Sequence, residues 1–137
     1  MDARTVQGWL DRYIAAWRSN DGAAIEGLFS RDAEYRYHPS DEPLHGPAEI
    51  ARSWLEDPDD PGSWDAWYRA FAVEGSNAVA TGVSTYLGDD GSVDRVYDNV
   101  FVMTFDDEGR CTGFTEWFMR RPDDRAHADA PAPASQG

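Results

Sequence analysis

The chain opens with apolar residues spaced as on one face of a helix. This stripe comprises Val6, Trp9, Leu10, Tyr13, Ile14 and Trp17. Apolar side chains that recur every three to four residues predict an amphipathic helix packed on a core. The polar residues 19–22 supply turn and N-cap chemistry, and a second, short helix is expected over 23–29. A third helix is expected from Gly46-Pro47, because proline is favoured in the first helical turn.

The pattern then changes to the alternation that is typical of strands. Residues 32–38 alternate between apolar or aromatic and charged side chains, which predicts a half-buried strand. Four longer β segments are expected at 63–74, 77–87, 93–105 and 110–120, joined by short turns rich in Gly and Asp. Turns this short predict an antiparallel meander.

Helices followed by such a meander predict the α+β class. The expected shape is a cone, in which a curved antiparallel sheet wraps over the N-terminal helices and leaves a cavity inside. Residues 1–121 are expected to form this domain. Residues 122–137 are rich in Pro, Ala and Asp without apolar periodicity, which predicts a flexible acidic tail.

Charge and composition exclude several classes of function. The 137 residues carry a formal charge of −14, so nucleic acids and anionic membrane surfaces are not expected partners. All 12 basic residues are Arg, which excludes lysine chemistry such as Schiff bases. The single cysteine, Cys111, excludes an intrachain disulfide. With no apolar run of membrane-spanning length and no signal-peptide pattern, a cytoplasmic location is expected.

Motifs for cofactors and metals are also absent from the sequence. No nucleotide-binding glycine loop, hydrolase elbow or zinc-protease motif occurs. His38 and His45 flank one loop, but a spacing of seven matches no sharp ligand pattern. We therefore expect neither a cofactor nor a metal.

Glu116 is the most informative polar residue. Alternation along its strand places it on the same face as Phe114 and Phe118. A carboxylate between two aromatic residues is either bonded to a partner, shifted upward in pKa by desolvation, or at a rim. The shifted case would suit a general acid or base, and the bonded case a structural role.

Tyrosine and tryptophan residues supply the remaining candidates for a pocket. Tyr13 lies in the helical stripe, where a buried phenol needs a hydrogen-bond partner. The other candidate lining residues are Trp17, Tyr35, Tyr37, Trp54, Tyr97, Asn99, Phe101, Phe114 and Phe118. Each alone is compatible with core packing, but together they predict an amphipathic pocket for a small hydrophobic ligand. On the opposite face of one strand, Val96, Val100 and Val102 could form an apolar interaction surface.

A resemblance to a known family rests on several short segments. These are residues 11–17 (DRYIAAW), 20–21 (ND), 27–29 (GLF), 32–35 (DAEY), 46–47 (GP), 105–110 (FDDEGR) and 116–118 (EWF). They resemble the nuclear transport factor 2-like superfamily, in particular its SnoaL-like, polyketide cyclase-like branch, over about residues 4–121. The resemblance implies an α+β cone, commonly a homodimer through the outer face of the sheet. It fits isomerases, dehydratases, cyclases, epoxide hydrolases and binding proteins alike.

Comparison with two enzymes of the superfamily narrows the chemistry. The helix tyrosine of ketosteroid isomerase matches Tyr13, but its base falls on Tyr37 and its protonated acid on Phe101, so that mechanism is disfavoured. For limonene epoxide hydrolase, the tyrosine resembles Tyr35 and the late-strand aspartate Glu116. Its central Arg and Asp fall on Val83 and Thr85, which cannot replace them.

The resemblance to the cyclase branch leaves acid/base chemistry on a small hydrophobic carbonyl or polycyclic compound. Glu116 or His38 would move the proton, and Tyr13 or Asn99 would polarise the carbonyl. The reaction would be a cyclisation, isomerisation or dehydration. Two alternatives stay open: a non-catalytic binding protein for a hydrophobic ligand, and a dimeric interaction module.

Overall fold

The computed structural model describes residues 1–123. Within them the elements run α1 (Ala3–Ser19), α2 (Gly22–Glu26), β1 (Phe29–Arg36), β2 (Leu44–His45), α3 (Gly46–Glu56), β3 (Trp64–Glu74), β4 (Asn77–Leu87), β5 (Val93–Phe105) and β6 (Cys111–Arg120). The α+β class is confirmed. The tail expected over 122–137 lies, from residue 124 onward, outside the described residues.

Helix α1 follows the apolar stripe and is set by its two ends. The Asp2 side chain accepts a hydrogen bond from the Thr5 amide at 2.8 Å, and Asn20 closes the helix in the left-handed conformation at φ 52°. Its buried residues are Val6, Trp9, Leu10, Tyr13 and Ala16. The predicted first helix is thus confirmed.

The segment after α1 differs from the sequence expectation. Helix α2 ends at Glu26, and Phe29 begins β1 instead of closing the helix. The expectation was wrong because Leu28 and Phe29 are buried on the sheet, where they supply the same apolar signal as a helix face. The two-residue strand β2 was not predicted, because two residues carry no alternation.

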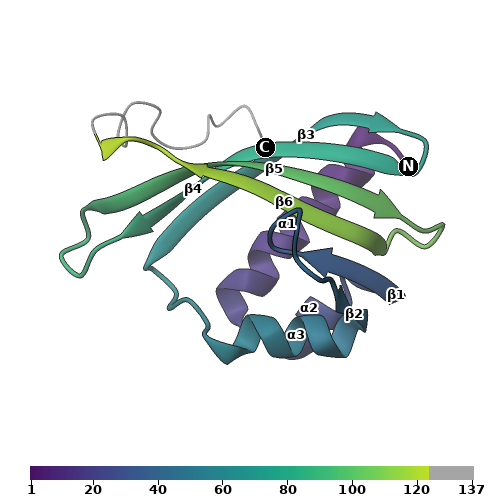
Figure 1. Ribbon diagram of the computed structural model, residues 1–137, viewed down its shortest axis with the longest axis horizontal. Coiled ribbons are helices and arrows are strands. Elements are labelled where there is room, and N and C mark those ends of the chain that lie inside the picture. Colours follow the sequence, from purple (N-terminus) through teal and green to yellow (C-terminus); the bar gives the residue numbers. More distant parts are fainter. Residues whose placement is uncertain (124–137) are drawn as a thin grey trace.

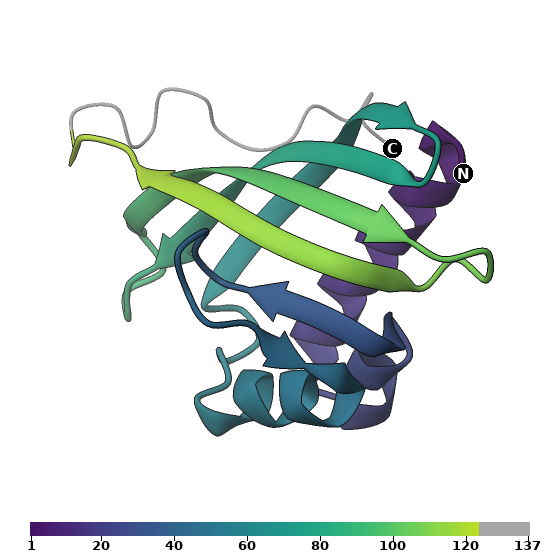
Figure 2. The same ribbon diagram turned by 45° about the vertical axis from the view of Figure 1, so that its right-hand side comes forward.

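The sheet has the order β2-β1-β6-β5-β4-β3. The four long strands form the predicted antiparallel meander. Strand β1 pairs with β2 antiparallel but with β6 parallel, so the sheet is mixed and not purely antiparallel. Figures 1 and 2 show the sheet curving over α1, with α2 and α3 at its open end.

The sheet curves where the strand pairing is irregular and where a glycine leaves room for a neighbouring side chain. Register shifts occur between Ala70 and Ala72 and between Tyr86 and Leu87, and such bulges bend a strand. A Cβ added to Gly82 would collide with the Tyr68 ring and with the Trp67 carbonyl oxygen. Gly82 thus lets the Tyr68 ring cross β4 on the inner face.

No helix among residues 1–123 is long and apolar enough to cross a membrane. In the same part of the chain, no three His, Cys, Asp or Glu side chains gather in a way that could hold a metal ion.

Candidate functional site

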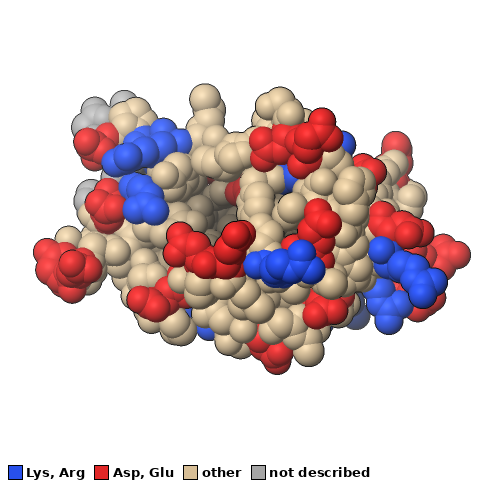
Figure 3. Space-filling model, turned by 60° about the horizontal axis from the view of Figure 1, so that its bottom comes forward, with Lys and Arg blue, Asp and Glu red and all other residues tan. Residues whose placement is uncertain are grey.

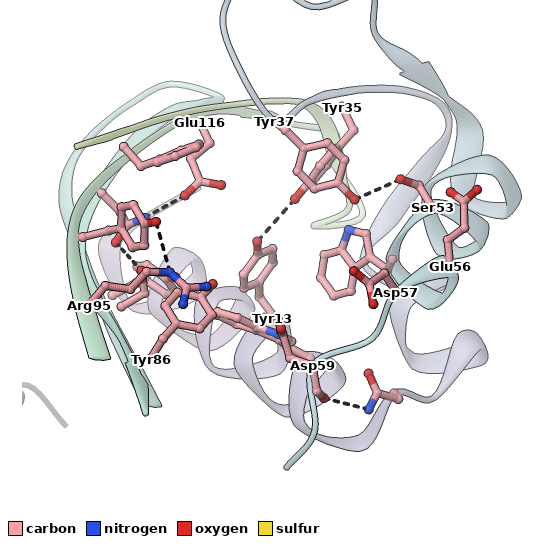
Figure 4. A pocket seen from close by; sticks show the side chains of 18 residues that line it. Tyr13, Tyr35, Tyr37, Ser53, Glu56, Asp57, Asp59, Tyr86, Arg95 and Glu116 are labelled. Atoms are coloured by element: carbon pink, nitrogen blue, oxygen red, sulfur yellow. Dashed lines mark hydrogen bonds between the residues drawn. The ribbon is translucent and has the colours of Figure 1, made fainter. Parts of the chain in front are cut away.

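A cavity of about 550 Å³ opens between the helices and the inner face of the sheet (Figure 4). Its lining comes from α1, β1, α3, the loop after α3, and strands β3 to β6. The lining residues are Tyr13, Trp17, Asn20, Tyr35, Tyr37, Ser53, Trp54, Glu56, Asp57, Asp59, Tyr68, Ser84, Tyr86, Arg95, Tyr97, Asn99, Glu116 and Phe118. Half of these residues are aromatic, which makes the cavity suitable for a hydrophobic molecule with a few polar groups.

Glu116 is held inside the cavity by a short chain of hydrogen bonds. The Asn99 amide nitrogen donates to Glu116 Oε2 at 2.7 Å, and the Ser84 hydroxyl donates to Asn99 Oδ1 at 3.0 Å. The strand register explains this arrangement. Asn99 pairs with Phe118 and Phe101 with Glu116, so Asn99 and Glu116 are diagonal neighbours on one face. Figure 4 shows the other carboxylate oxygen pointing into the cavity.

The environment of Glu116 changes its ionisation. Burial among aromatic side chains raises its pKa from 4.5 to about 7, while the hydrogen bond from Asn99 and the nearby His38 act in the opposite direction. The carboxyl therefore exchanges its proton near neutral pH. A group with this property can act as either acid or base in a cell.

Several tyrosine residues line the same cavity as this carboxyl. The Tyr13 and Tyr35 hydroxyl oxygens lie 3.3 Å apart, and the Tyr37 hydroxyl lies 3.0 Å from Ser53 Oγ. Burial raises the pKa of Tyr13, Tyr35 and Tyr68 well above 10, and the charge of Glu116 adds to the increase. These phenols stay protonated at neutral pH and can donate hydrogen bonds to a ligand oxygen.

Charged side chains gather at the mouth of the cavity. Glu56, Asp57 and Asp59 stand there, with Arg95 as the cation among the lining residues. Figure 3 shows the hollowed face with carboxylates around it. The Trp17 indole donates to Asp59 Oδ2 at 3.0 Å, which fixes the loop after α3 against α1.

The structure brings together most of the residues that the sequence singled out. Those in the cavity lining are Tyr13, Trp17, Tyr35, Tyr37, Trp54, Tyr97, Asn99, Glu116 and Phe118. Phe101 and Phe114 lie outside the lining in the core, where their rings pack against Tyr13 at 5.4 and 5.6 Å between centroids. His38 is also outside the lining, with an exposed ring that contacts Phe118 and bonds Asp41 at 2.9 Å.

Sequence reasoning missed several polar residues of the lining. Ser84 and Tyr86 share the inner face of β4, and a serine on an otherwise apolar face was a detectable signal. Arg95 and Asp59 carried none, because one lies near the start of a strand and the other in a loop whose Pro and Gly indicate only a break.

The outer face of the sheet agrees in part with expectation. Val100 and Val102 are exposed there, whereas Val96 is buried at 2% exposure and cannot contribute to a contact surface. Phe71, Trp117 and Met119 are further exposed apolar side chains, the last 77% exposed.

The fold and the cavity together define a class of α+β proteins in which a curved sheet and helices enclose a site for a small molecule. The chain belongs to the SnoaL-like domain family, whose model matches residues 10–114. The resemblance to the SnoaL-like branch is thereby confirmed.

Solved structures with this fold cover nearly the whole chain. A protein from Kribbella flavida DSM 17836, provisionally assigned as a ketosteroid isomerase, matches with a TM-score of 0.65 and 20% identity over 98% of this chain and 95% of its own. A nuclear transport factor 2-like protein of unknown function from Burkholderia xenovorans LB400 matches with a TM-score of 0.64 and 20% identity, over 95% and 97%. No curated protein matches in sequence. At this identity the two structures establish the fold alone.

Proposed function

We propose that the protein catalyses cofactor-independent proton transfer on a small hydrophobic carbonyl compound, with Glu116 as the acid/base. One observation carries the proposal. The Glu116 carboxyl is fixed through one oxygen by Asn99 and presents the other to an aromatic cavity, at a pKa near neutrality. A general base needs this combination of position and ionisation.

The chemistry follows from the groups around that carboxyl. Ionised Glu116 accepts the proton from the carbon next to a ketone, and the electron pair of the C–H bond moves to give an enolate. The Tyr13 hydroxyl, which burial keeps protonated, donates a hydrogen bond to the enolate oxygen. When the ketone is β,γ-unsaturated, the enolate takes the proton back from Glu116 at its γ-carbon. Otherwise its α-carbon attacks a second carbonyl, whose oxygen takes that proton, or the enolate expels a leaving group from the β-carbon, which departs with that proton. These routes give isomerisation, cyclisation or dehydration.

The ligand best suited to the cavity is neutral and largely apolar. The mouth carries Glu56, Asp57 and Asp59 against Arg95, so an anionic ligand meets net repulsion there. Inside, tyrosine and tryptophan rings offer flat apolar contact. Aromatic and polycyclic ketones satisfy both conditions.

His38 does not fit the role of acid/base as well as Glu116 does. Its ring is exposed beside Phe118 and outside the cavity lining. Its proposed part is electrostatic, because its charge lowers the pKa of Glu116.

The proposal is tested by deuterium exchange into 2-tetralone in D₂O, followed by proton NMR. The wild-type protein is expected to accelerate exchange at the carbons beside the ketone, and Glu116→Gln to lose about 100-fold or more of that acceleration. Glu74→Gln, which removes an exposed carboxylate from β3, serves as the matched control.

Two results would contradict the proposal in different ways. Unchanged exchange in Glu116→Gln would assign the proton transfer to another residue. Binding of the ketone without any acceleration by the wild-type protein would favour the non-catalytic alternative, in which the same cavity only holds a hydrophobic ligand.

We also propose that a second copy of the chain covers the outer face of the sheet. Val79 pairs with Val102 across β4 and β5, and Val100 pairs with Trp117 across β5 and β6. Copies that each carry a formal charge of −14 repel one another, so a patch of apolar side chains is where two can meet. A self-complementary contact of this kind gives a two-fold homodimer.

A further inference from the structure

Two polar side chains of the cavity lining are buried without being the acid/base itself. Ser84 is 3% exposed and Asn99 is 5% exposed, and they are the buried polar side chains of residues 1–123. Even when it is hydrogen-bonded, a buried polar side chain contributes little net stability compared with an apolar residue of similar shape. Their presence calls for a role beyond packing.

The direction of the hydrogen bonds indicates that role. Ser84 donates its hydroxyl proton to Asn99 Oδ1, which turns the amide nitrogen of Asn99 toward Glu116 Oε2. In the opposite orientation the amide oxygen of Asn99 would face the carboxylate, and two acceptors would repel. These two hydrogen bonds therefore fix one oxygen of the Glu116 carboxyl, Oε2.

We infer that Ser84 and Asn99 are positioning residues, which together hold Glu116 Oε2 and leave the other oxygen directed at the carbonyl compound. The inference deepens the proposed function and rests on Glu116 being its acid/base. Asn99 acts on the carboxyl directly, and Ser84 acts through Asn99. Neither residue moves a proton in the reaction.

Loss of the two hydrogen bonds that join Ser84, Asn99 and Glu116 must also change the ionisation of Glu116. The hydrogen bond from Asn99 favours the charged form, so its removal raises the pKa further. Other titratable or charged groups face the same cavity and act on Glu116 both in the wild type and in variants that lack these hydrogen bonds. They are Tyr13, Tyr35, Tyr37, Tyr68, Tyr86, Tyr97, Arg95, Glu56, Asp57 and Asp59, and His38 acts on Glu116 from outside the lining.

The test follows the Glu116 side chain by NMR in protein labelled with ¹³C at the glutamate carboxyl carbons. The resonance is assigned from its disappearance in Glu116→Gln. In Asn99→Leu we expect the pKa of Glu116 to rise by about one unit, a tenfold change in its ionisation constant. Ser84→Ala should raise it in the same direction by a smaller amount.

Three variants separate positioning from general packing. Ser84→Thr keeps the hydroxyl and should restore the wild-type titration. Thr85→Ala removes a hydroxyl from the adjacent residue of β4, which faces the other side of the sheet. This variant should leave the titration of Glu116 unchanged. Asn99→Asp replaces Asn99→Leu if that variant fails to fold, because it keeps the shape of the side chain. It places a second carboxyl beside Glu116, so the carboxyl of the pair that ionises later should do so with a raised pKa.

An unchanged Glu116 titration in both Ser84→Ala and Asn99→Leu would overturn the inference. So would a shift in Ser84→Ala that Ser84→Thr fails to reverse. These readouts require no turnover, so they fail or succeed separately from 2-tetralone exchange. If the wild-type protein exchanges the ketone, Ser84→Ala should lower kcat and leave KM near its original value.

Discussion

Replacing Glu116 by Gln should change how the stability of the protein depends on pH. The pKa of Glu116 is about 7 in the folded protein, whereas in the unfolded chain it has its ordinary value of 4.5. Between these values the folded state binds more protons, so the free energy of unfolding falls as pH rises. This loss is complete above about pH 7.

The size of the effect follows from the pKa difference. At about 1.4 kcal/mol for each unit, the change from 4.5 to about 7 corresponds to about 3 kcal/mol. Glutamine is neutral at every pH, and its carbonyl oxygen can still accept the hydrogen bond from Asn99. Glu116→Gln should therefore match the wild type at pH 4 and exceed it by about 3 kcal/mol at pH 8.

Urea unfolding followed by tryptophan fluorescence, at intervals from pH 4 to pH 8, measures this difference. Subtracting the two curves removes the contribution of every other titrating group. Glu74→Gln, the exposed control, should run parallel to the wild type. A difference between Glu116→Gln and the wild type that stays constant across this range would refute the reasoning, because it would mean that burial does not shift the Glu116 carboxyl.

Three further predictions address the fold, the site and the surface. Gly82→Ala should destabilise the protein by about 1–3 kcal/mol in urea unfolding, because its methyl group collides with Tyr68 and the backbone; unchanged stability would mean that the ring does not cross there. Tyr13→Phe should lower 2-tetralone exchange about 100-fold with folding retained, as expected for a lost donor to an enolate, and full activity would exclude Tyr13 as that donor. Met119→Asp, on the outer face of β6, should convert the proposed dimer to a monomer in analytical ultracentrifugation, and a wild-type monomer would contradict the proposed contact.

Local patterns predicted the elements better than their pairing. The stripe from Val6 to Trp17 gave α1 because helical periodicity extends over several turns. The parallel pairing of β1 with β6 joins Phe29 to Cys111, residues far apart in the chain, and no local pattern encodes it. The early start of β1 was missed because buried residues at a helix end and at a strand start look alike.

The candidate site was predictable where one strand face carried an unusual residue. Glu116 between Phe114 and Phe118 stood out from alternation alone. Ser84 and Asn99 gain their meaning only from the register that makes them diagonal neighbours across β4 and β5. Phe101, expected in the pocket, lies behind its lining because the Tyr13 and Tyr68 rings cover it.

The pH dependence of 2-tetralone exchange by the wild-type protein tests the role of Glu116 most directly. A base with this ionisation predicts a rate that rises through an inflection near pH 7 and then reaches a plateau, and the inflection should vanish in Glu116→Gln. An inflection near pH 4.5, or one near pH 7 that survives in Glu116→Gln, would contradict the account.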